Sequence, residues 1–151
     1  MSDPGDVGAG PDPHGLERFV AAQALVIDEV LDELRRGRKA SHWMWFVFPQ
    51  IAGLGHSAMA QRYAIASAAE ARAYLAHPVL GRRLFDATAL VNGHAGRSAS
   101  AIFGAPDDIK FRSSMTLFAA VAPDRAPFQR ALRTFFDARP DPQTLARLAS
   151  A

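Results

Sequence analysis

The chain has 151 residues with 15 acidic and 17 basic side chains, so its formal net charge is +2 at neutral pH. The proportions of 49% hydrophobic and 21% charged residues are typical of one soluble globular domain with a sizeable core. The absence of cysteine excludes disulfides, thiolate catalysis and cysteine-based zinc sites. No apolar run approaches the roughly 20 residues that a membrane-spanning helix requires. We therefore expect a cytoplasmic protein with no membrane partner.

The beginning of the chain differs in composition from the rest. Residues 1–15 are acidic and rich in glycine and proline, and they lack the basic patch and apolar segment of a secretory signal. This composition predicts a disordered lead-in over 1–15, followed by a single all-helical domain over 16–151. Residues 1–37 carry a net charge of −5, against +3 for 38–80 and +4 for 81–133. We expect the acidic part to neutralise the basic part, and without a dense Lys/Arg cluster a nucleic-acid partner is not favoured.

The first half of the domain predicts helices joined by a glycine-rich turn. Apolar residues recur at helical spacing over 16–36, and Gly37 is a natural stop. Gln23 interrupts this stripe, so we expect its amide to tie the helix to a neighbouring backbone, with a ligand contact as the alternative. A short helix over 42–46, with Ser41 as its cap, ends before Pro49. The following segment, 53–55, has the sequence GLG and predicts a tight turn.

The second half predicts further helices and no strand. Ser67 and Glu70 form a capping box that opens a helix ending at Leu75, and Pro78 begins another that ends near Val91. The later expected elements are a short turn over 101–103, a helix from Asp107 or Asp108 to Val121, a helix over 128–135, and a last short helix capped by Asp141. The sequence therefore predicts a compact all-α bundle of about six to eight helices with no significant sheet.

No familiar catalytic or cofactor signature is present, so we expect no cofactor. The five histidines show no metal-ligand spacing, and we expect no metal site. The basic residues are unusual, because 15 are arginine and only Lys39 and Lys110 are lysine. Both lysines lie beside aromatic and hydroxyl-bearing residues, and a position that retains lysine favours a compact ammonium group. Chance is the alternative explanation.

Several other residues have both a structural and a functional interpretation. His42 is either an acid/base group or a hydrogen-bonded strut. Trp43 and Trp45 are most simply core residues, but consecutive aromatics on a short helix cannot all face inward, so we expect one to line a groove. Ser113 and Ser114 either bond to the preceding helical turn or present hydroxyl groups to a ligand.

Three segments resemble a known family. HWMWFVFPQIAGLGHS (42–57), RYAIASAAEARAYLAHPVLGRRL (62–84) and IFGAPDDIKFRSSMTLF (102–118) are together similar to a bacterial and plant family of unknown function, domain-of-unknown-function family 1810. The resemblance covers about residues 16–145 and implies a compact, single-domain, all-helical fold without implying an activity. Positions of its signature that bear polar or aromatic side chains here include Gln23, Lys39, His42, Trp43, Gln50, Tyr63, Arg82, Lys110, Ser113 and Ser114.

These observations predict a pocket between 39–57 and the start of the 107–121 helix. It would bind an anionic, nucleotide-like small molecule, with hydrolysis or transfer at a nucleotide or sugar linkage as the candidate reaction. The candidate catalytic residues are His42, Lys110 and Ser113, and the candidate ligand-binding residues are Lys39, Trp43, Gln50, Tyr63, Arg82 and Ser114. Whether the protein is an enzyme stays open. The alternative is a non-enzymatic module that binds a protein partner, and a large separation of the two lysines would favour it.

Overall fold

A computed structural model describes residues 11–150, and within this range the chain forms ten helices and no strand. The helices are α2 (Glu17–Ala24), α3 (Ile27–Arg35), α4 (Met44–Val47), α5 (Ala58–Arg62), α6 (Ala68–Ala76), α7 (Leu80–Asn92), α8 (Ala99–Phe103), α9 (Asp107–Val121), α10 (Ala126–Phe136) and α11 (Pro142–Ser150). One isolated parallel bridge pairs Ile51 with Ile65. The predicted all-helical class is confirmed, but the expected number of six to eight helices was wrong.

The extra helices arise where sequence periodicity carries little information. The single helix expected over 16–36 breaks at Leu25 and Val26, because its halves pack on different neighbours: α2 on α4, and α3 on α7. The helices α5 and α8 have five residues each. Such helices are too short to show a full repeat of the 3.6-residue period.

The local capping signals identify some helix starts and not others. Ser67 Oγ accepts a hydrogen bond from the Glu70 N–H group at 3.1 Å, and Asp141 Oδ2 accepts one from Thr144 N–H at 3.1 Å, so both predicted caps are confirmed. The predicted Ser41 cap is wrong, because α4 begins after Trp43 and the Ser41 hydroxyl donates instead to Glu33. Helix α7 begins at Leu80, two residues beyond the predicted start at Pro78.

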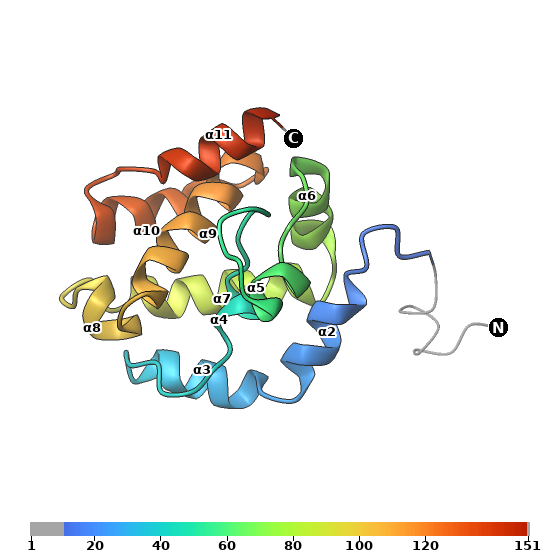
Figure 1. The fold of residues 1–151 in the computed structure, drawn as a ribbon. Coiled ribbons are helices and arrows are strands. Elements are labelled where there is room, and N and C mark those ends of the chain that lie inside the picture. The colour runs from blue at the N-terminus through green and yellow to red at the C-terminus, as the bar shows by residue number, and fades with distance from the viewer. Residues whose placement is uncertain (1–10, 151) are drawn as a thin grey trace.

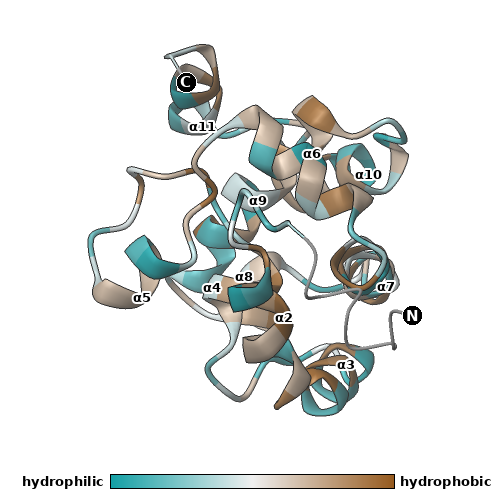
Figure 2. Cartoon of the chain, turned by 90° about the vertical axis from the view of Figure 1, so that its right-hand side faces the viewer, coloured by the Kyte–Doolittle hydropathy of each residue, from teal (hydrophilic) through white to brown (hydrophobic). Residues whose placement is uncertain are grey.

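The helices pack in layers around one aromatic core. Helix α3 lies at one side of the molecule and α11 at the other, with α7 and α9 between them (Figure 1). In Figure 2, α3 alternates between hydrophobic and hydrophilic residues along its length, as expected for a helix with one buried face. Phe48 and Phe111 are fully buried with ring centroids 5.0 Å apart, and this contact packs the segment after α4 against α9. The core thereby joins the two segments in which the site was predicted.

Gln23 has the structural role that the sequence favours. Its side chain is 1% exposed, and Nε2 donates hydrogen bonds to the Phe46 carbonyl oxygen at 2.6 Å and to the Tyr74 hydroxyl at 2.9 Å. These bonds tie α2 to α4 and α6. Residues 1–10 of the predicted lead-in lie outside the described range, whereas Asp12 accepts hydrogen bonds from the Leu16 and Glu17 N–H groups and so caps α2.

Candidate functional site

A buried carboxylate fixes the segment that leads into the site. Glu33, on α3, is 4% exposed. It accepts hydrogen bonds from Ala40 N–H at 2.7 Å, from Ser41 N–H at 3.0 Å, from Ser41 Oγ at 2.6 Å and from Trp43 Nε1 at 2.9 Å. Burial acts to raise the pKa of Glu33, but these hydrogen bonds outweigh it and lower the pKa to about 2. The ionised side chain therefore holds residues 40–43 in place directly after Lys39.

Both lysines of the chain reach the same carboxylate. Lys39 Nζ lies 2.9 Å from Asp107 Oδ2, and Lys110 Nζ lies 3.6 Å from Asp107 Oδ1. Each ammonium also lies near a tryptophan ring, Lys39 at 5.2 Å from the Trp43 centroid and Lys110 at 5.3 Å from the Trp45 centroid. We call these five residues the lysine site. With two ammonium groups and one carboxylate, the lysine site carries a net positive charge.

The two lysines differ in how far they are committed to Asp107. The Lys39 side chain is 7% exposed, and the backbone N–H of Lys39 donates to the Ile102 carbonyl oxygen at 2.7 Å. The Lys110 side chain is 25% exposed, and its contact with Asp107 is longer. Lys39 is therefore a buried, paired cation. Lys110 has the exposure and the looser contact that binding an external anion requires.

A narrow recess adjoins the lysine site through the ring of Trp45. Its volume is about 10 Å³, and it is lined by Trp45, Gln50, Ile51, Gly53, Gly55, Ala60, Tyr63 and Ala64. The structure thus brings the predicted ligand residues Gln50 and Tyr63 to the same recess. A volume of this size admits about one water molecule. A larger ligand would have to lie over the recess with only its edge inserted.

Trp43 and Tyr63 lie mostly in the core. Trp43 is 1% exposed and donates its ring N–H to Glu33, and Tyr63 is 8% exposed with its ring 5.3 Å from that of Phe46. Their faces are therefore occupied by protein contacts. Trp45 is half-buried, so it is the tryptophan whose ring is available at the surface.

The remaining predicted site residues lie apart from the lysine site in their contacts. Ser113 Oγ donates to Asp141 Oδ2 at 3.2 Å, and Ser114 is fully buried with no hydrogen-bond partner for its hydroxyl among residues 11–150. His42 is exposed and makes no hydrogen bond or ion pair with the lysine site. Arg82, on α7, is 81% exposed and faces its helical neighbour Asp86 at 3.8 Å.

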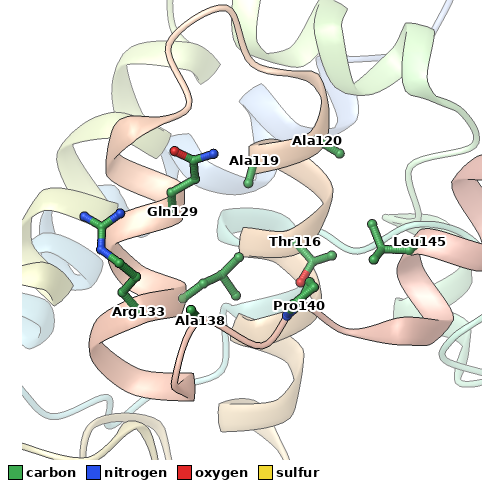
Figure 3. A pocket seen from close by; sticks show the side chains of 9 residues that line it. Thr116, Ala119, Ala120, Gln129, Arg133, Ala138, Pro140 and Leu145 are labelled. Atoms are coloured by element: carbon green, nitrogen blue, oxygen red, sulfur yellow. The ribbon is translucent and has the colours of Figure 1, made fainter.

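The largest cavities lie elsewhere in the fold. One of about 470 Å³ is bounded by α9, α10 and the chain that leads into α11 (Figure 3), and it is lined by Thr116, Ala119, Ala120, Gln129, Leu132, Arg133, Ala138, Pro140 and Leu145. Figure 3 shows the polar ends of Gln129 and Arg133 on the α10 side, across from the methyl groups of α9. A second cleft of about 460 Å³ lies between α7 and α10.

Other classes of site find no support in residues 11–150. The described helices include none that is long and apolar enough to cross a membrane. Nor do His, Asp and Glu side chains of this range gather in a group of three that could hold a metal ion.

Sequence reasoning did not assign Asp107 and Trp45 to the site. Asp107 was considered only as a helix cap, although its position three residues before Lys110 places the two side chains on one face of α9. That spacing was the available signal. The approach of Lys39 had no local signal, because it depends on how the 39–57 segment packs against α9.

Comparison with known proteins agrees with the resemblance found in the three motifs. The family described as "Protein of unknown function (DUF1810)" matches residues 13–148. The crystal structure of the conserved hypothetical protein Rv1873 from Mycobacterium tuberculosis is similar, with a TM-score of 0.90 and 53% sequence identity over 91% of this chain and 99% of that chain. A search of curated proteins finds no match. These findings confirm the family resemblance and supply no activity.

Proposed function

Because the chain belongs to DUF1810, a family of proteins of unknown function, we propose a function from the geometry of the lysine site: it binds an anionic small molecule that carries a flat ring. One observation supports this proposal above the others. Lys39 and Lys110 are the two lysines of the chain, and both reach the Asp107 carboxylate although they come from different parts of the fold. A large separation of these lysines would have favoured the interaction module instead.

The charges of the lysine site suit an anion better than a purely structural ion pair. One lysine is enough to neutralise Asp107, so the second ammonium is in excess. Lys110 is the more exposed of the two and can form charge-assisted hydrogen bonds with a phosphate or carboxylate. The residual charge is screened by salt, so the affinity should fall with ionic strength.

The neighbouring recess accounts for the flat ring. Trp45 is half-buried and offers a ring beside the ammonium of Lys110, and Gln50 adds a half-buried amide next to it. A planar group lying on Trp45 could accept or donate a hydrogen bond with that amide while its anionic substituent meets Lys110. A nucleotide-like molecule has this combination of groups.

The contacts of the predicted catalytic residues favour binding over a defined reaction. A general base must lie within hydrogen-bond reach of the group that it activates. Ser113 bonds to Asp141, and His42 bonds to neither Ser113 nor Lys110 in the described structure. Hydrolysis or transfer at a nucleotide or sugar linkage therefore stays a hypothesis, which requires His42 to approach a ligand bound at Lys110.

The test is a thermal-shift screen against nucleotides, NAD derivatives, sugar phosphates and simple anions, followed by titration of any ligand found. A ligand at a hundred times its dissociation constant should add about 2.7 kcal/mol to the free energy of unfolding. Lys110→Met should abolish binding with little change in melting temperature. Arg82→Ala removes an exposed cation from α7 and should bind normally.

Asp107→Asn separates the binding role from a structural one. The substitution removes the negative charge between the lysines, so we expect roughly tenfold tighter anion binding. The same protein should melt at a lower temperature, because the nearly buried Lys39 loses its partner. A flat screen, or a lower melting temperature without tighter binding, would refute the proposal and favour the interaction module.

A further inference from the structure

The cleft between the end of α7 and the start of α10 has the features of a second ligand site. Its volume of about 460 Å³ lies within the usual range for small-molecule sites. It is lined by Ala89, Asn92, Gly93, Ala126, Pro127, Arg130 and Arg133. The first three are spaced by three and four residues and so share one face of α7, and the others share one face of α10. Both walls are therefore regular helix, which holds the lining side chains in fixed positions.

Asn92 is the buried polar group of this cleft, and half of its amide is unused. The residue is 4% exposed, and Nδ2 donates to the Pro127 carbonyl oxygen at 3.1 Å, which links the two walls. Exchanging the two ends of the amide would place one acceptor against another, so this bond fixes its orientation. Asn92 Oδ1 is then a buried acceptor with no hydrogen-bond partner in residues 11–150. Buried polar atoms are rarely left in this state, and a donor bound in the cleft would satisfy it.

The same cleft carries excess positive charge. Arg130 and Arg133 are exposed and lie about one turn apart on α10, and neither forms an ion pair with another described residue. The carboxylate near this end of α10 is Asp124, whose Oδ1 accepts a hydrogen bond from Ala126 N–H at 3.1 Å. The N-terminal end of α10 adds a partial positive charge. Planar guanidinium groups bind a carboxylate through two parallel hydrogen bonds, so an anionic group should lie against these arginines.

We infer that this cleft binds a small zwitterion of the α-amino-acid type. Its carboxylate binds Arg130 and Arg133, and its ammonium group donates to Asn92 Oδ1. A simple anion would satisfy the arginines and leave the Asn92 acceptor unpaired. A simple cation would satisfy Asn92 and face two arginines of like charge. Only a ligand with both groups matches the whole cleft, and the lysine site offers no such unpaired acceptor.

Isothermal titration of the full chain with L-alanine, L-glutamine and L-phenylalanine tests this inference, since the three probes differ in size and share the zwitterion. L-Lactate replaces the ammonium of L-alanine by a hydroxyl and is the matched probe. We expect at least one amino acid to bind, and its hydroxy-acid analogue to bind at least tenfold more weakly. No binding of the three amino acids at 10 mM (about the weakest affinity of interest), or equal binding of the hydroxy acid, would overturn the inference.

Variants of exposed arginines locate the binding without threatening the fold. Arg130→Ala/Arg133→Ala should weaken amino-acid binding at least tenfold. The control, Arg35→Ala/Arg72→Ala, removes the same charge from exposed positions on α3 and α6 and should change affinity less than twofold. Undiminished binding by the first variant would place the amino acid elsewhere and overturn the inference. Lys110→Met should leave amino-acid binding unchanged, so the failure of either site can be recognised independently.

Discussion

Replacing Glu33 by Gln should destabilise the protein in a pH-dependent way. The ionised carboxylate accepts four hydrogen bonds from Ala40, Ser41 and Trp43. Glutamine has nearly the same shape but offers one acceptor oxygen, so its NH₂ group must face some of these donors. The buried donors that lose their acceptor cannot turn to water, and the segment leading from Lys39 into α4 is weakened.

The pKa of Glu33 sets the magnitude. Its ordinary value is 4.5 and its value in the folded protein is about 2. At roughly 1.4 kcal/mol for each pKa unit, ionised Glu33 contributes about 3 kcal/mol to the free energy of unfolding at pH 7. Because the folded pKa is lowered, this stabilisation is complete above about pH 5 and is lost as the pH falls toward 2. For a chain of this length, about 3 kcal/mol corresponds to roughly 6–12 °C in melting temperature.

The assay is urea denaturation followed by circular dichroism at several values between pH 7 and pH 3. The difference in free energy of unfolding between the natural protein and Glu33→Gln should be largest at pH 7 and should shrink steadily below pH 5. Glu29→Gln, at an exposed position of the same helix, is the control and should show neither effect. A difference that is constant over this range, or below about 1 kcal/mol at pH 7, would refute the reasoning.

Two further substitutions test the packing that positions the site. Gln23→Leu leaves the buried Phe46 carbonyl oxygen without its donor and should lower the free energy of unfolding by about 1–3 kcal/mol in a denaturant titration, and an unchanged midpoint would contradict this role. Gly81→Ala would place a Cβ atom 2.1 Å from the Leu75 carbonyl oxygen, so its melting temperature should fall sharply. Gly96→Ala meets no atom within 4 Å and should melt within a few degrees of the natural protein, and equal effects of the two substitutions would show that the close approach is unimportant.

Local signals in the sequence were sufficient where a helix boundary depends on its own residues. Ser67 and Asp141 cap the helices that follow them because each cap is completed within three residues. The same reasoning failed at Ser41, whose hydroxyl is drawn to Glu33 eight positions earlier. It also failed at Leu25, where no glycine or proline marks the break between α2 and α3.

The sequence by itself determined the helical class, the family, most of the helix starts and the two lysines as unusual positions. Hydrophobic periodicity and capping are local, so these features do not depend on how the chain folds back on itself. The tertiary structure alone decided that Lys39 and Lys110 meet at Asp107, and that Trp43 is buried while Trp45 remains partly exposed. These outcomes depend on the packing of the 39–57 segment against α9, which is a relation between distant residues that no local pattern encodes.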